Sequence, residues 1–172
     1  RHNSMETTIR RARASDAGAL YRLLKSIGWF KAILADPPEV ATRRIAKHLV
    51  LCNADHSHSV YVAVRTLENP DGEPEPVEPV LGYLSVHWLP YLILSGPEGY
   101  ISELFVAEGE RGQGIGSKLL ETVVKEARER ECFRLSLINF RDRDSYQRRF
   151  YEKRGWEERP DAANFVYVLE LN

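Results

Sequence analysis

Residues 100–131 decide the fold, and they read YISELFVAEGERGQGIGSKLLETVVKEARERE. The first seven residues predict a strand, with Ile101, Glu103 and Phe105 on one face. From Ile115 onward, apolar residues recur at helical spacing and predict an amphipathic helix. The loop between the two elements carries glycine at alternate positions 112, 114 and 116. The predicted order is therefore strand, glycine-rich loop, helix N-terminus.

This loop has the composition of a phosphate site. A helix N-terminus offers unpaired N–H groups and a partial positive charge, and glycine lets a phosphate approach the backbone closely. Arg111 adds a permanent positive charge. We interpret the loop as a pyrophosphate site; a tight turn that needs glycine only for its geometry is the alternative. The dinucleotide pattern GxGxxG fails at Ser117, and the P-loop pattern fails because Leu119 follows Lys118.

Two motifs resemble the GNAT superfamily of N-acetyltransferases. Arg111, Gly114 and Gly116 fill the family's pattern Arg/Gln-x-x-Gly-x-Gly/Ala, and FYEKRGW at 150–156 is similar to its Tyr-x-x-x-Gly-Phe segment. The resemblance implies an α/β (α+β) fold with a mixed, mostly antiparallel sheet flanked by helices. It also implies a V-shaped splay between strand 100–106 and a strand predicted at 133–139, where the pantetheine arm of acetyl-coenzyme A would lie.

The resemblance implies acetyl-coenzyme A as co-substrate, with no metal. Many relatives carry Asn seven residues before the motif tyrosine, but this chain has Asp144, which puts that contact in question. The cofactor-binding residues implied in this way are Leu104, Phe105, Val106, Arg111, Gly112, Gln113, Gly114, Ile115, Gly116, Ser117 and Asp144.

Acetyl transfer to an amine needs a base for the amine and a proton donor for the thiolate. Tyr151 occupies the place of the family's usual general acid; a packing role for a core aromatic is the alternative. Glu103 is a carboxylate within an otherwise apolar strand and is the candidate base; a salt-bridged carboxylate is the alternative. The resemblance implies direct attack in a ternary complex, without an acyl-enzyme.

The acceptor is expected to be a small-molecule amine or a peptide amine. Aromatic residues in the segments where family members build the acceptor pocket are the candidate lining, or else plain core residues: Trp29, Phe30, Tyr83 and Trp88. Two rival functions stay open. One is a coenzyme A-binding sensor without catalysis, and the other is a nucleotide- or phosphate-binding module that uses the same loop.

Composition narrows the class of protein. The 172 residues are 43% hydrophobic and 28% charged, with a formal net charge of −1, which fits one globular domain and disfavours a nucleic-acid partner. No apolar run is long enough to span a membrane, and two cysteines indicate a reducing, cytoplasmic setting. A homodimer stays open. We expect residues 1–4 to be an expression remnant and residues 5–172 to form the domain.

Four further features carry expectations. Residues 68–79 hold five acidic residues and four prolines and predict an extended hairpin loop. His56 and His58 lack further metal ligands nearby in sequence and are interpreted as turn residues. We do not propose Cys52 or Cys132 as a nucleophile, because we expect no activating histidine or helix N-terminus beside either thiol. The β-branched and aromatic run at 165–171 predicts a last strand.

Overall fold

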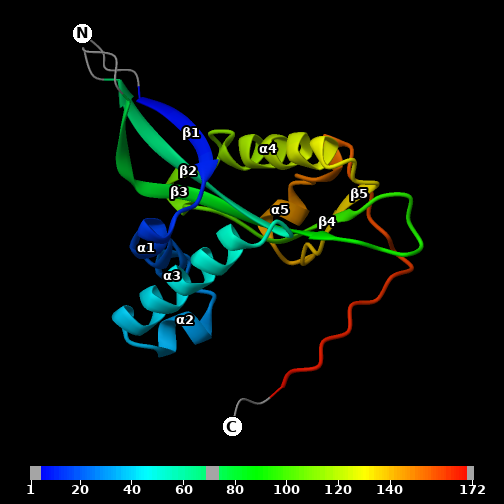
Figure 1. Cartoon of the computed structure of the whole chain (residues 1–172), viewed down its shortest axis with the longest axis horizontal. Helices are drawn as coiled ribbons and strands as arrows, with labels where there is room; N and C mark the ends of the chain where they lie inside the picture. The colour runs from blue at the N-terminus through cyan, green and yellow to red at the C-terminus, as the bar shows by residue number, and fades with distance from the viewer. Residues whose placement is uncertain (1–4, 69–73, 170–172) are drawn as a thin grey trace. The chain divides into compact units, whose positions relative to one another are not determined.

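The computed structural model describes residues 5–68 and 74–169 (Figure 1). The chain divides into two compact units, Arg1–Leu137 and Ile138–Asn172. The first unit holds a five-stranded sheet of sequential order. Neighbouring strands are antiparallel except for the last pair, which is parallel, so the predicted mixed, mostly antiparallel sheet is confirmed. The strands are β1 Met5–Arg11, β2 His58–Glu68, β3 Pro74–Leu89, β4 Glu98–Val106 and β5 Arg134–Leu137.

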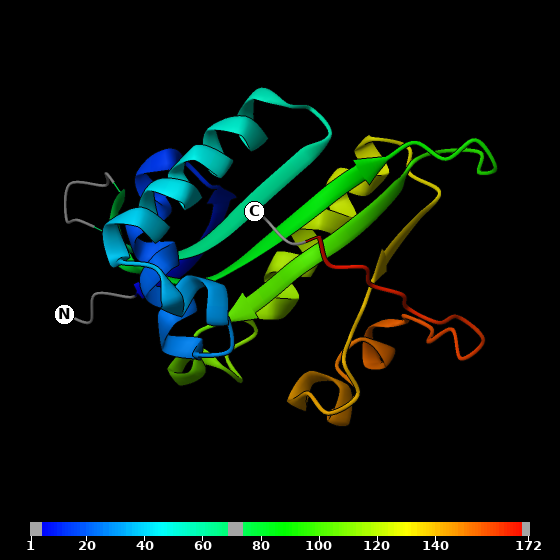
Figure 2. The same cartoon turned by 90° about the horizontal axis from the view of Figure 1, so that it is seen from below.

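Helices cover both faces of this sheet. The short 3-10 turn η1 (Ala14–Asp16) leads into α1 (Ala17–Ile27), which ends at Gly28 with φ 78°. Helices α2 (Lys31–Ala35) and α3 (Pro38–Ala54) lie on the same side as α1, and α4 (Ile115–Glu129) lies on the opposite side (Figures 1 and 2). The sheet therefore has an α1–α3 face and an α4 face.

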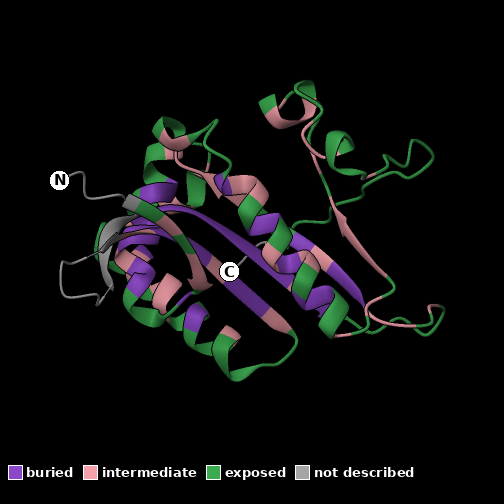
Figure 3. Cartoon of the chain, turned by 90° about the horizontal axis from the view of Figure 1, so that it is seen from above, coloured by how far each residue is buried: buried purple, intermediate pink, exposed green. Residues whose placement is uncertain are grey.

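The core follows the predicted periodicities. Leu119, Leu120 and Val123 of α4 are buried, as the helical spacing required. Central strands are buried on both faces, and Figure 3 shows this continuous band through β2, β3 and the start of β4. On the α1–α3 face the core joins Leu20 and Leu24 of α1 to Val62 of β2 and Tyr83 of β3.

The parallel pair of strands is short, and it leaves part of β4 without a strand partner. Pairing between β4 and β5 runs from Glu98 opposite Arg134 to Ile101 opposite Leu137. Beyond Ile101, residues 102–106 of β4 continue without a β5 partner among the described residues. A bulge between β3 and β4 adds Ser102, because Ser85 pairs with Glu103 and the next residue pairs with Ile101. The parallel pairing therefore ends at this point of β4, where β5 itself ends, and the splay between the two strands stays a prediction.

Close backbone packing holds the start of the glycine-rich loop. A Cβ on Gly82 of β3 would meet the Phe105 carbonyl oxygen at 2.8 Å, so only glycine lets β4 approach here. The Ala107 N–H donates to the Leu81 carbonyl at 2.8 Å. The 3-10 turn η2 (Glu108–Glu110) follows, and Glu110 pairs with Arg65 of β2. The loop therefore begins from a fixed position.

The prediction of an extended loop at 68–79 is wrong for most of that segment. Strand β2 includes Glu68, and β3 begins at Pro74, so the hairpin ladder continues into the segment. β4 pairs with β3 only from Gly82 onward, which leaves residues 74–79 with one unpaired edge. Proline is tolerated at such an edge because its missing N–H costs no ladder bond. Residues 69–73 lie outside the described residues.

The second unit is largely irregular. It contains α5 (Asp144–Gln147) and the 3-10 turn η3 (Glu152–Arg154), which ends at Gly155 with φ 85°. The predicted last strand is not formed over its described part, because residues 165–169 are irregular. All five of these apolar side chains are exposed. High β-propensity alone does not produce a strand without a paired neighbour. The prediction that 5–172 is one domain stays a prediction.

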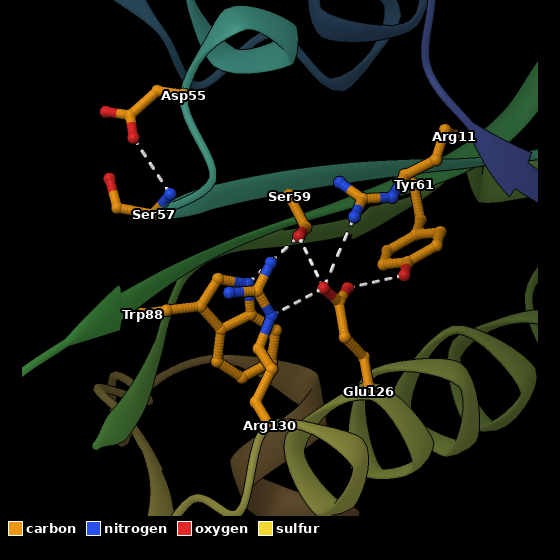
Figure 4. Close-up of polar contacts among 8 residues, drawn as sticks. All are labelled: Arg11, Asp55, Ser57, Ser59, Tyr61, Trp88, Glu126 and Arg130. Atoms are coloured by element: carbon orange, nitrogen blue, oxygen red, sulfur yellow. Dashed lines mark hydrogen bonds and ion pairs between the residues drawn. The ribbon is translucent and has the colours of Figure 1, made fainter.

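A buried carboxylate joins α4 to the sheet (Figure 4). Glu126 accepts hydrogen bonds from Tyr61 at 2.5 Å, Arg130 at 2.8 Å, Ser59 at 3.1 Å and Arg11 at 3.2 Å. Burial alone would raise the pKa of Glu126, but the bonds from Tyr61, Arg130 and Ser59 hold that pKa below its usual value. The same burial, with the neighbouring carboxylate, raises the pKa of Tyr61 to about 12.

Replacing this carboxylate should weaken the fold. Glu126→Gln removes the negative charge that pairs with both Arg11 and Arg130, and we expect a loss of about 2–4 kcal/mol in the free energy of unfolding. Urea titration followed by circular dichroism measures it. Glu121→Gln, on the exposed face of the same helix, is the matched control and should change stability by less than about 0.5 kcal/mol.

The stability that Glu126 contributes should also depend on pH. The folded-state pKa of Glu126 is lowered, so its stabilisation is complete above the usual glutamate pKa of about 4.3 and is lost as the pH falls through the lower folded-state value. The difference between wild type and Glu126→Gln should therefore be constant near neutrality and shrink in acid. Equal free energies of unfolding for both proteins at pH 7 would show that the Glu126 carboxylate does not stabilise the packing of α4 on the sheet.

Candidate active site

The glycine-rich loop is exposed, and two of its glycines have positive φ. Gly112 and Gly114 have φ of 81° and 79°, which side chains with a Cβ rarely adopt. Gly114 is the N-cap of α4, and no side chain caps the helix. The predicted cofactor-binding residues from Arg111 to Ser117 therefore surround one helix N-terminus, whose N–H groups and dipole favour an anion.

The candidate base lies on the α1–α3 face of β4. Glu103 is exposed and accepts a hydrogen bond from the Tyr83 hydroxyl at 3.1 Å. Tyr83 is buried, and burial together with the Glu103 charge raises the pKa of its phenol. Tyr83 therefore stays protonated and orients the carboxylate of Glu103.

Aromatic rings gather beside this pair. The Phe105 ring lies 5.0 Å from Phe30, 5.8 Å from Tyr83 and 6.1 Å from Trp29, as measured between ring centroids. Trp29 remains 43% exposed, so it is not a closed core residue. Three of the four predicted acceptor residues are thus brought together next to Glu103.

Trp88 is not part of that group. Its side chain is buried on the α4 face, where the indole N–H donates to Ser59 at 2.9 Å and Arg130 lies over the ring at 4.8 Å. Tyr83 and Trp88 are five residues apart, and an odd spacing along a strand places side chains on opposite faces. The alternation of side chains along this strand could have predicted from the sequence that Tyr83 and Trp88 lie on opposite faces.

Tyr151 belongs to the second unit and is packed there against aromatic neighbours. Its ring lies 5.0 Å from Phe150 and 5.7 Å from Trp156. Burial raises the pKa of Tyr151 to about 12, although the Arg154 charge lowers it somewhat. The phenol is therefore held protonated at neutral pH. Asp144, in the same unit, is exposed and paired with Arg148 at 2.6 Å.

A polar strip on the same face of the sheet as Glu103 was missed. The Cys52 sulfur lies 2.8 Å from His58 Nδ1, and His58 Nε2 lies 2.6 Å from the Ser85 hydroxyl. His58 stacks on His87, which contacts Ser102 at 2.9 Å. The interpretation of His58 as a turn residue is therefore wrong, since it begins β2, and Cys52 has a histidine partner after all.

This thiol and imidazole form a neutral pair. Burial raises the pKa of Cys52, while burial and the neighbouring His87 lower the pKa of His58 to about 4. The thiol therefore stays protonated, so the contact does not make Cys52 a nucleophile. The six-residue spacing was visible in the sequence, but the helix end that brings the two together was not.

Over residues 5–68 and 74–169, no group of three or more His, Cys, Asp or Glu side chains is arranged to hold a metal ion. Within the same ranges, no helix has both the length and the apolar character needed to cross a bilayer.

Comparison with known proteins decides the family. Residues 28–156 match the acetyltransferase (GNAT) family. The chain belongs to this family of acetyltransferases. The family uses acetyl-coenzyme A and acts on amine acceptors, so this GNAT protein is an N-acetyltransferase.

Individual relatives are distant. The chain is 26% identical over 130 residues to a thialysine N-ε-acetyltransferase of Bos taurus, covering 75% of this chain and 72% of the relative. A transcriptional regulator from Bacillus halodurans has the same fold, with a TM-score of 0.74, 22% identity and coverage of 94% and 100%. An aminoglycoside acetyltransferase from an uncultured soil metagenomic sample also has this fold, with a TM-score of 0.66 and 22% identity. The match covers 95% of this chain and 97% of that one.

Proposed function

We propose that this GNAT protein transfers the acetyl group of acetyl-coenzyme A directly to a primary aliphatic amine in a ternary complex. In this proposal the loop from Arg111 to Ser117 binds the pyrophosphate, and residues 104–106 line the pantetheine. Glu103 is the base, and Tyr151 is the proton donor to the thiolate. The observation that carries the proposal is the exposed Glu103 carboxylate, oriented by Tyr83 beside a ring cluster.

The Glu103 carboxylate and the neighbouring aromatic rings fit an alkylammonium acceptor. An aliphatic amine of the lysine type has a pKa of about 10.4 and arrives protonated, so it is attracted both to a carboxylate and to aromatic faces. Glu103 supplies the first, and Phe105, Phe30 and Trp29 supply the second. The thialysine relative is named for an ε-amine of this kind, which supports the same class of acceptor here.

The raised pKa of Tyr151 refines its proposed role. A thiol has a pKa of about 8.5, so full proton transfer from a phenol at about 12 runs uphill by roughly 3.5 units, or about 5 kcal/mol. A hydrogen bond to the developing thiolate avoids most of that cost. We therefore assign Tyr151 to hydrogen-bond stabilisation of the leaving thiolate, with the final proton supplied by solvent.

The loop is tested by a pair of substitutions at Gly114. Asparagine and aspartate have the same shape and both tolerate positive φ, and a Cβ at Gly114 meets nothing within 4 Å. Gly114→Asp should bind coenzyme A at least about tenfold more weakly than Gly114→Asn, because only aspartate repels the pyrophosphate. Calorimetric titration measures both. Equal affinities would show that the pyrophosphate lies elsewhere.

The base is tested by steady-state kinetics with lysine analogues and polyamines. Glu103→Gln should lower kcat by about 10²–10⁴ at neutral pH and leave the affinity for coenzyme A unchanged. Tyr83→Phe, which removes only the orienting hydrogen bond, should have a smaller effect of the same kind. Glu39→Gln, exposed on α3, is the neutral control. A Glu103→Gln protein with wild-type kcat would require another base.

Tyr151→Phe separates catalysis from packing. The phenylalanine keeps the contacts with Phe150 and Trp156 and removes only the hydroxyl. We expect kcat to fall about 10²-fold or more while acetyl-coenzyme A affinity and melting temperature stay within error. Binding of coenzyme A without thiol release by the wild type, over a wide set of amines, would favour the rival sensor function.

A further inference from the structure

A pocket lies at the opposite end of α4 from the glycine-rich loop. It has a volume of about 300 Å³, and its walls include Arg11, Asn53, Asp55, His56 and Arg130. It opens where β1 ends, since pairing with β2 stops at Arg11 opposite Tyr61. α4 spans 15 residues, so its two ends are about 22 Å apart. Arg130 stands at the C-terminal end, whereas the proposed pyrophosphate site is at the N-terminal end.

The two arginines of the pocket are fixed in place. Arg11 Nη2 and Arg130 Nε both bond the same oxygen of Glu126, at 3.2 and 2.8 Å (Figure 4). Each guanidinium also lies over a ring, Arg11 over Tyr61 at 5.0 Å and Arg130 over Trp88 at 4.8 Å. Two positive charges are thus held close together before any ligand arrives.

Hydrogen-bond donors remain at these positions. A guanidinium carries five N–H groups, and the bond to Glu126 takes one from each arginine. The Asn53 amide has two N–H groups and gives one to the Ala12 carbonyl at 3.2 Å. The planar fork of arginine matches carboxylate and phosphate oxygens.

Two arginines and two carboxylates set the charge at the pocket. Glu126 offsets one of the two arginines. Asp55 is the second carboxylate and lies in the pocket wall. Its side chain accepts a hydrogen bond from the Ser57 N–H at 2.9 Å (Figure 4). His58 faces Cys52 and Ser85 and adds no charge at neutral pH, since its pKa is lowered to about 4.

We propose that this pocket binds the carboxylate or phosphate group of a small molecule between Arg11 and Arg130, with Asn53 and His56 at its sides. The volume is at the lower end of the range for small-molecule sites, so the ligand is a compact metabolite rather than a second coenzyme A. This site lies at the opposite end of α4 from the proposed pyrophosphate loop and does not depend on the function proposed above.

The test uses inorganic phosphate and malonate as probes on the full chain. Titration is followed by the ¹⁵N NMR signals of the arginine Nε–H groups at constant ionic strength, in the presence of saturating coenzyme A. The Arg11 and Arg130 signals should shift and saturate with at least one probe. Tighter phosphate binding would indicate a phosphorylated ligand, and tighter malonate binding a carboxylate. The readout is local, so it succeeds or fails whether or not coenzyme A occupies the other site.

His56→Glu is the decisive variant. His56 is exposed and outside the Glu126 network, so the substitution adds a negative charge to the pocket without disturbing the fold. It should weaken probe binding about tenfold or more. His48→Glu makes the same change at an exposed α3 position outside the pocket wall, where salt screens the charge, and should bind like wild type. Unshifted arginine signals with both probes, or equal binding by His56→Glu and wild type, would overturn the proposal.

Discussion

The rest of the first unit depends on the Glu126 carboxylate. An amphipathic helix on a sheet is held mainly by apolar burial, which is not directional and leaves the helix able to slide or rotate. Glu126 removes that freedom because its four donors come from β1, β2 and α4 itself. Ser59 extends the connection to β3 through Trp88. An ionised group at this depth is tolerable only because every donor is present, and the fixed helix then aims its N-terminus at one place.

The second constraint is the point at which β4 loses its parallel partner. A bulge at Ser102 and the end of β4–β5 pairing occur at the same level of the sheet. Glu103 follows at once, exposed on the α1–α3 face, while residues 104–106 lead to the glycine-rich loop. The proposed base Glu103 and the N-cap Gly114 of the proposed anion site are therefore only eleven positions apart in the chain (114 − 103). In the proposed function, this one short stretch carries both a carboxylate for the amine and glycines for the pyrophosphate.

Sequence reasoning worked where the physics is local. Periodicity located β4 and α4, because strand and helix spacing follow from neighbours within a few residues. It failed where distant contacts decide. Residues 165–169 have the composition of a strand but pair with no other strand among the described residues. Residues 74–79 do pair with β2 despite their prolines, because their other edge has no β4 partner. The Cys52–His58 contact required knowing where α3 ends, and Glu126 looked like any helix glutamate until its partners from β1 and β2 were in view.

The two anion sites proposed at the ends of α4 would work by opposite means. At the N-terminus the helix dipole and free N–H groups attract an anion directly, so glycine is sufficient there. At the C-terminus the dipole is negative and would repel an anion, but the same field stabilises a cation such as Arg130. Glu126 also binds Arg11 through the same oxygen, so two guanidinium groups lie at this end of the helix. The C-terminal pocket therefore depends on side chains that a single substitution can reverse, whereas the N-terminal loop depends on backbone that only a change in φ can alter.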